Sequence, residues 1–276
     1  MRNPDHQISF LVSCGYFRAT RRFYAPADFV DRDIAYVARQ LDHSVPSNVR
    51  YPDRTRQRHQ QVILDFHGFT PFDLSASTTL ATEIATMARM HLKPRLIFDR
   101  CVDFLIQRRV QVPSAHRLND LIRASLHERK AEMIALMDSQ LLAETRNLLD
   151  DLFTAPDAQN RYRLTLLKRL SQSTSPSRIK EAVADFAILS ELHHQLGDIL
   201  VQLDLGTAGI RYFAGGVLRS EIFQMRRRDQ NDRYIHAAAF VAHQFYRCQD
   251  NMVDLWLSVM ASVSYTHLTL PTTPYV

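Results

Sequence analysis

Residues 50–73 read RYPDRTRQRHQQVILDFHGFTPFD, and they predict one short helix with clear limits. Asp53 can cap the first turn, because its carboxylate can accept hydrogen bonds from the free N–H groups there. Gly68 suits the left-handed conformation just past the last turn, and Phe69 can then pack back on Leu64. We therefore expect a helix between Asp53 and Gly68.

The two sides of this helix differ in chemistry. The side expected to pack inward carries residues at helical spacing: Thr55, His59, Val62, Ile63 and Phe66. The opposite side carries four long hydrogen-bonding side chains: Arg54, Gln57, Arg58 and Gln61. Arg can pair with guanine and Gln with adenine in the major groove of DNA, and both can bind phosphate. The strip is typical of a DNA-recognition helix, although Arg and Gln are also common on solvated faces.

The residues before this helix predict two more. DRDIAYVARQL, residues 31–41, places four apolar side chains on one face: Ile34, Val37, Ala38 and Leu41. A polar turn separates it from the Arg-bearing helix, which gives the order of a helix-turn-helix with a long connection. Earlier still, residues 8–24 predict a helix with basic groups that can contact phosphate: Arg18, Arg21 and Arg22.

A second unit of the same kind is predicted farther along the chain. Helices are expected at residues 77–92 and 94–109, and Ser114 is a good N-cap for a long helix. The expected buried stripe of that helix is Leu118, Leu121, Ile122, Met133, Ile134 and Met137. Its expected exposed side chains are His116, Arg117, Asn119, Arg123, His127 and Lys130. Two such units would extend a footprint on DNA, but the charged face of an ordinary bundle helix has the same pattern.

The composition predicts an all-α fold. The 276 residues are 46% hydrophobic and include only 7 Gly, and long stretches are rich in good helix formers. The net charge of +5 and the pI of about 9.2 favour an anionic partner. The apolar stretches are shorter than the roughly 20 residues that span a bilayer, and MRNPDHQ has no signal-peptide pattern. We therefore expect a cytoplasmic protein with no membrane contact.

No catalytic or metal-binding motif is recognisable in the sequence. Three cysteines lie far apart and are expected in the core: Cys14, Cys101 and Cys248. Two His pairs lack the spacing of a metal-ligand motif: His193 and His194, and His236 and His243. Asp250 and Asp254 do lie at i, i+4 and could share a cation, but carboxylates at that spacing are usually solvated or paired with Arg or Lys. We expect no enzymatic activity and no cofactor, and a metal-dependent hydrolase that uses the His residues is the weakest alternative.

Several segments, in this order, resemble one protein family. They are FLVSCGYFRATRRF (10–23), DIAYVARQLD (33–42), YPDRTRQRHQQVILDFHGFTPF (51–72), RRVQVPSAHRLNDLI (108–122) and the stretch 211–257. Together they resemble the N-terminal part of the transposases of Tn-three-type (class II, replicative) bacterial transposons. In that family the N-terminal helical domains bind the terminal inverted repeats of the element, which implies a nucleoid-associated protein.

The resemblance also implies which residues meet DNA. The first unit would contain Arg54, Arg56, Arg58 and His59. The second would contain Arg108, Arg109, Ser114, His116 and Arg117. A later ribonuclease-H-like domain of the family uses a DDE carboxylate triad with Mg²⁺, and we assign no residue of this chain to that triad.

Four segments are predicted along the chain. Residues 1–75 and 76–155 are expected to be two helical DNA-binding domains, 156–262 a helical linker region, and 263–276 a non-native tail. The tail, VSYTHLTLPTTPYV, is expected to break a long apolar helix and resembles translated adapter sequence, which predicts a chain truncated before the DDE domain. If their packing partners lie in the missing part, truncation would expose four large side chains: Phe240, Val241, Leu255 and Trp256.

The leading hypothesis is therefore a non-catalytic part of a transposase. Its partner would be duplex DNA carrying the terminal inverted repeat, and it could also self-associate. The alternative is a helical scaffold whose basic faces meet an acidic protein partner.

Overall fold

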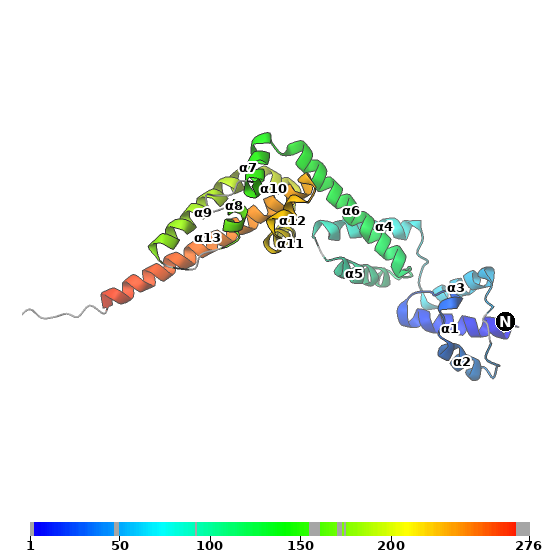
Figure 1. Ribbon diagram of the computed structural model, residues 1–276. Helices are drawn as coiled ribbons and strands as arrows, with labels where there is room; N and C mark the ends of the chain where they lie inside the picture. Colours follow the sequence, from blue (N-terminus) through cyan, green and yellow to red (C-terminus); the bar gives the residue numbers. More distant parts are fainter. Residues whose placement is uncertain are drawn as a thin grey trace, which may run out of the picture. The chain divides into compact units, whose positions relative to one another are not determined.

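The chain folds into helices throughout the part that the structure describes (Figure 1). This computed structural model describes residues 3–46, 50–91, 93–154, 161–169, 173 and 175–268, with only the backbone for 262–268. These residues form no β-strand, only isolated β-bridges, which confirms the predicted all-α fold. The helices are α1 (Pro4–Thr20), η1 (Pro26–Asp28), α2 (Asp31–Gln40), α3 (Asp53–His67), α4 (Leu74–Arg89), α5 (Pro94–Gln107), α6 (Ala115–Gln140), α7 (Ala143–Thr154), α8 (Arg163–Leu167), α9 (Pro176–Gln195), α10 (Gly197–Leu203), α11 (Gly206–Arg219), α12 (Ile222–Arg226) and α13 (Gln230–Leu268).

Backbone contacts divide the chain into two compact units. The first comprises Met1–Ala88 and Leu92–Glu128, and the second comprises Arg89–His91 and Arg129–Val276. The division falls inside α6. The predicted limits of independent domains at residues 75 and 155 stay predictions, and residues 155–160 lie outside the described part.

The first unit begins with α1, which lies between α2 and α3 (Figure 1). One side of α1 contributes Ile8 and Val12 to a cluster with α2. Another contributes Phe17 to a cluster with Ile63 and Leu64 of α3. The two helices of the predicted helix-turn-helix, α2 and α3, thus both pack on α1, but in two different hydrophobic clusters.

The ends of α3 follow from local chemistry. Gly68 is left-handed, with φ 66°, and the Phe69 N–H donates to the Leu64 carbonyl at 2.9 Å. Phe69 packs in the same cluster as Leu64, so the predicted helix stop is confirmed. The predicted cap was wrong by one residue, because the helix already begins at Asp53 and no side chain caps it.

The buried face of α3 differs from the predicted stripe. His59 and Ile63 are buried as expected, but Val62 is 47% exposed and Phe66 is 79% exposed. Leu64 is buried in their place. The reason is the position of α1, which covers α3 from one side and leaves the edge with Val62 and Phe66 open.

The second bundle of the first unit contains α4, α5 and the start of α6. Its core is formed by apolar side chains of all three helices and of the connection between α5 and α6: Leu80, Ile84, Met87, Ile97, Cys101, Leu105, Val112, Leu118 and Ile122. Asp73 caps α4, since its carboxylate accepts from the Ala76 N–H at 2.8 Å, so α4 begins before the predicted residue 77. Ser114 caps α6 as predicted, and it accepts from the Arg117 N–H at 3.2 Å.

Backbone hydrogen bonds join the two bundles of the first unit. Thr70 follows α3 and pairs with the segment before α6: its N–H donates to the Arg109 carbonyl at 2.8 Å, and its carbonyl accepts from the Gln111 N–H at 2.9 Å. The Val112 N–H then donates to the Arg21 carbonyl at the end of α1 at 2.9 Å. These hydrogen bonds form a junction of Arg21, Thr70 and residues 109–112, which fixes the end of α3 next to the start of α6.

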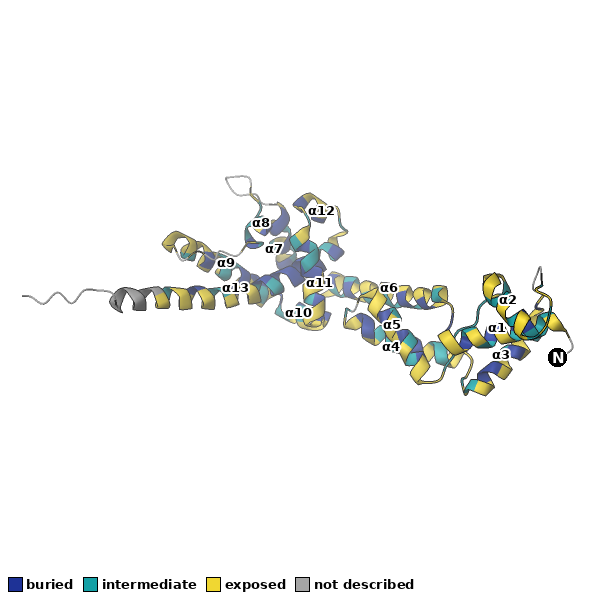
Figure 2. Ribbon diagram, turned by 90° about the horizontal axis from the view of Figure 1, so that it is seen from below, coloured by how far each residue is buried: buried dark blue, intermediate teal, exposed yellow. Residues whose placement is uncertain are grey.

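The second unit is built on α13, which packs along α9 and α11. Figure 2 shows the first half of α13 buried and its later turns largely exposed. Phe240, Val241 and Leu255 are buried among residues of the chain itself, so the condition under which they would be exposed is not met for these three. Trp256 is 66% exposed.

Two predicted features lie at or beyond the limits of the described residues. The helix that was expected to break at residue 263 continues to Leu268. Residues 269–276 of the predicted tail lie outside the described part. No helix among the described residues has both the length and the apolar character that crossing a membrane requires.

Candidate nucleic-acid interface

The positive charge of the chain lies in its N-terminal part. Residues 1–125 contain 18 Lys and Arg against 12 Asp and Glu, and the basic residues are all Arg except one. Residues 126–276 contain 16 Lys and Arg against 17 Asp and Glu. The whole basic excess thus lies within residues 1–125, a distribution that the net charge alone conceals.

The predicted strip on α3 is exposed. Arg54, Gln57, Arg58 and Gln61 all face solvent. Gln61 donates to the Asp65 carboxylate at 2.8 Å. Within the described residues, Arg54 and Arg58 have no acidic partner. These two guanidinium groups are free to bind an anion.

Arg56 and His59 lie on the other side of α3. Arg56 pairs with Asp53 at 2.8 Å, and only 29% of its side chain is exposed. His59 is buried and shares a hydrogen bond of 2.9 Å between its Nδ1 and the Tyr51 hydroxyl, while Phe10 packs edge-on against the ring. Burial lowers the pKa of His59, and His6 and Arg58 lower it further. The ring is therefore a neutral core group that supports the helix.

The basic residues near the start of α6 are also exposed. Arg108 stacks over the ring of Phe104, with 4.5 Å from its Cζ to the ring centroid, and Arg117 stacks over Phe72 at 5.1 Å. Such stacking keeps a guanidinium extended and leaves its N–H groups available. Arg123 is exposed and has no acidic partner within the described residues.

The remaining predicted residues of this helix have structural partners. His116 pairs with Asp120 at 3.3 Å on an exposed surface. Ser114 uses its hydroxyl to cap the helix. The predicted exposed face of α6 is confirmed, and four side chains of the predicted stripe are buried while Leu121 and Ile134 are partly buried.

The junction brings Arg21 and Arg109 together. Both have a left-handed backbone, with φ 57° and 55°. That conformation is unfavourable for a side chain other than Gly by about 1 kcal/mol. The Arg21 guanidinium stacks on Phe69 at 5.3 Å, and an Arg109 Nη1 lies 3.2 Å from where a Cβ on Gly68 would stand. The two guanidinium groups thus lie against consecutive residues after α3, Gly68 and Phe69.

A third residue near the end of α3, His67, lies close to Arg21 and Arg18. Burial lowers the pKa of His67, and the charges of Arg21 and Arg18 lower it further. The basic character of Arg18 and Arg21 was visible in the sequence, but the placement of Arg21 and Arg109 at one backbone junction was not. It depends on the pairing of Thr70 with Val110, which lie forty residues apart.

Two of the His residues considered as metal ligands, His236 and His193, pack within the second unit. His236 is buried, and its Nδ1 forms a hydrogen bond with the Phe213 carbonyl at 2.9 Å. His193 stacks on Phe245, with ring centroids 4.2 Å apart. Among the described residues, no three His, Cys, Asp or Glu side chains are grouped as metal ligands would be.

The first unit corresponds closely to a known domain. Residues 1–125 match the family model of a domain of unknown function, DUF4158. The DUF4158 domain occurs in transposase-like proteins. Its match ends three residues before the first compact unit ends at Glu128. A comparison with curated proteins gives no match.

Proposed function

We propose that the DUF4158 region binds duplex DNA as the end-binding part of a transposase. The observation that carries this proposal is the set of exposed arginines without acidic partners on two helices that one hydrogen-bonded junction holds together. Guanidinium groups bind phosphate with two parallel hydrogen bonds, and release of counterions from DNA supplies affinity. The proposed contacts exclude His59, because it is buried.

The dimensions of α3 suit a groove of DNA. Arg54 and Gln61 are seven residues apart, which is about 10 Å along a helix and about three base-pair steps. Arg58 and Gln57 lie between them on the same side. We infer that this strip reads bases and that Arg108, Arg117 and Arg123 mainly hold phosphates.

The ordered resemblance supports a finer proposal. The DNA would be the terminal inverted repeat of a Tn-three-type element, and the role of the described residues would be binding rather than chemistry. Transposition would then need a DDE domain with Mg²⁺, and none of the residues proposed here is assigned to that step.

One observation favours the alternative of a protein partner. Val62 and Phe66 are exposed at the edge of the Arg-bearing strip. A surface that is both apolar and basic also suits an acidic amphipathic segment. This alternative predicts no preference for DNA of any sequence.

A gel-retardation experiment separates the two functions. The full chain is mixed with a duplex selected by the chain itself from a randomised pool, and with a scrambled duplex of equal length, over a series of salt concentrations. We expect tighter binding to the selected duplex and a steep loss of affinity with salt. Equal and salt-insensitive binding to both duplexes would refute DNA recognition.

A further inference from the structure

Arg21 and Arg109 share an unusual combination of backbone and side chain. Each occupies a left-handed position at a helix end, where Gly is the usual residue. Each uses its carbonyl to accept a junction hydrogen bond, from Val112 and from Thr70. The backbone at both positions would be better served by Gly, so the two Arg side chains call for another explanation.

The surroundings of the two side chains are electrostatically unbalanced. The Arg21 guanidinium lies over the ring of Phe69, and an Arg109 guanidinium nitrogen lies beside Gly68. His67 comes directly before these two residues in the sequence. Within the described residues, no ion pair joins either Arg to an Asp or Glu. Like charges gathered without a carboxylate are stabilised when an anion binds between them.

We propose that Arg21 and Arg109 form a clamp for one backbone phosphate of duplex DNA at the junction between the two helical bundles. The clamp rests on the proposed DNA-binding function and adds a sequence-independent contact to it. Arg is suited to this role, since its planar group offers two parallel N–H donors to a phosphate.

The position of the clamp gives it a further role. The α3 helix ends and the connection to α6 begins at the same backbone pairing, so a phosphate held there is fixed relative to both helices. The distance between the stretches that the two helices contact is then set by the protein. A flexible linker between two domains would leave that distance variable.

The test replaces each Arg by the residue that its backbone favours. Arg21→Gly, Arg109→Gly and the double variant are compared with the wild-type chain on mixed-sequence duplex DNA. We expect each single variant to bind several-fold more weakly, with the slope of log affinity against log salt reduced by about 0.9 for the phosphate contact that is lost. Thermal unfolding should stay unchanged or move slightly upward, because Gly relieves the left-handed backbone.

Two control variants isolate the effect. Asp42→Gly changes another left-handed residue of the first unit, with φ 54°, and should not weaken binding. Arg39→Gln removes one exposed positive charge from α2 and should change the salt slope little. If the Gly variants unfold, Arg21→Asn and Arg109→Asn are used in their place, because Asn also adopts the left-handed backbone conformation.

The outcomes separate the clamp from the general function. If the Gly and Asn variants bind with wild-type affinity and slope while Arg54→Ala weakens binding, the clamp is refuted and DNA binding stands. If the wild-type chain does not bind duplex DNA, the proposed function fails and the clamp fails with it. The clamp is supported if the Arg21 and Arg109 variants bind DNA more weakly at unchanged thermal stability while the two control variants bind as the wild type does.

Discussion

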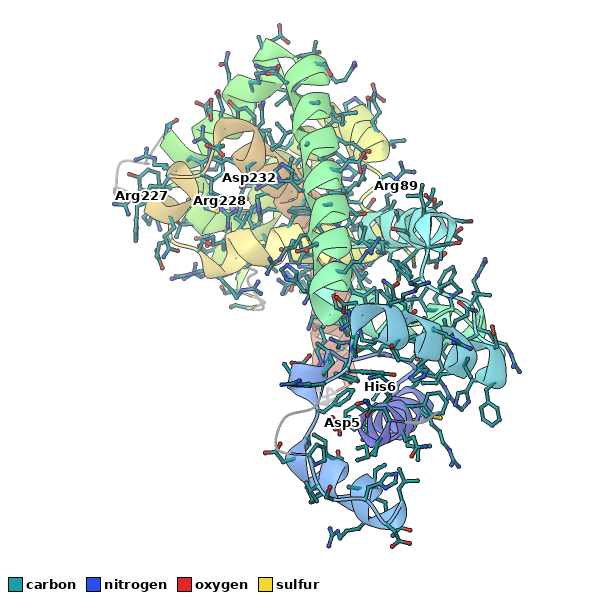
Figure 3. The ribbon with its side chains drawn as sticks, turned by 90° about the vertical axis from the view of Figure 1, so that its right-hand side faces the viewer. Asp5, His6, Arg89, Arg227, Arg228 and Asp232 are labelled. Atoms are coloured by element: carbon teal, nitrogen blue, oxygen red, sulfur yellow. The ribbon has the colours of Figure 1, made fainter. Side chains whose placement is uncertain are left out.

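Arginine has opposite roles in the two units of this protein. In the second unit, Arg228 pairs with the buried carboxylate of Asp232 at 3.1 Å (Figure 3). Lys130 pairs with the same carboxylate at 3.0 Å, and Arg233 pairs with Asp150 at 3.1 Å. In the first unit, Arg54 and Arg58 are exposed and have no acidic partner within the described residues. The same residue type therefore stabilises one unit and leaves the other with charge that is not neutralised.

The difference shows why the number of arginines is a poor guide to function. The two parts of the chain contain similar numbers of basic residues, 18 and 16, but in the second part they are matched by acids. Only where the acids are too few or too distant is the charge available to an outside partner. Substitutions in the two units should therefore affect different properties.

The largest effect is expected on DNA affinity from the double variant Arg54→Ala, Arg58→Ala. Each base-reading Arg contributes about 1 to 3 kcal/mol, so affinity for the selected duplex should fall by more than tenfold. Thermal stability should hardly change, because both side chains are exposed and unpaired. Fluorescence anisotropy and circular dichroism measure the two properties. If the double variant loses helical signal while its folded molecules bind DNA as the wild type does, Arg54 and Arg58 stabilise the fold and do not contact DNA.

The next effect is expected on stability from Asp232→Asn in the second unit. The change keeps the size of the side chain but leaves Arg228 and Lys130 without their counter-charge. We expect a loss of about 2 kcal/mol in the free energy of unfolding, less than for fully buried partners because both are partly exposed. Asp198→Asn, an exposed acid of the same unit, serves as the control in urea unfolding. Equal midpoints for the two variants would contradict the structural role of Asp232.

A moderate effect of acid is expected in both units. Burial lowers the pKa of His236 in the second unit and of His59 in the first, from an ordinary value of 6.5. Above pH 6.5 both rings are neutral whether the chain is folded or unfolded, so their contribution is fully present. As the pH falls below 6.5, the unfolded chain takes up protons first, and stability is lost until the folded pKa is passed.

Urea midpoints on either side of that pH measure the effect. We expect His236→Gln and His59→Gln each to reduce the loss of stability on acidification. A pH dependence identical to the wild type in both variants would show that other groups cause it.

The smallest effect is expected from Arg56→Ala. Although Arg56 lies on α3, its pairing with Asp53 makes it resemble the arginines of the second unit. We expect a loss of about 0.5 kcal/mol in stability and unchanged DNA affinity. A fall in affinity as large as that for Arg54→Ala would place Arg56 in the interface, as the resemblance to the transposase family implies.

The sequence was sufficient for features that depend on neighbouring residues. Gly68 and Ser114 mark a helix end and a helix start through local hydrogen bonds, and both were predicted correctly. The outer face of α6 was also predicted, because its apolar stripe is long and regular.

Features set by distant residues were not predictable in the same way. Val62 and Phe66 are apolar and lie at helical spacing, but only the position of α1 decides that they remain exposed. Likewise, the placement of Arg21 and Arg109 at one junction depends on backbone hydrogen bonds between distant residues, the pairing of Thr70 with Val110 among them. A hydrophobic pattern identifies which residues can be buried, but not which of them a neighbouring helix covers.

The most direct measurement is the affinity of the full chain for mixed-sequence duplex DNA across a series of salt concentrations. If the exposed arginines of the first unit bind phosphates, log affinity should fall linearly with log salt, with a slope that corresponds to several phosphate contacts. Arg233→Ala, which removes an arginine paired within the second unit, should leave that slope unchanged in molecules that remain folded. Absence of binding, or affinity that does not respond to salt, would contradict a DNA-binding role for the first unit.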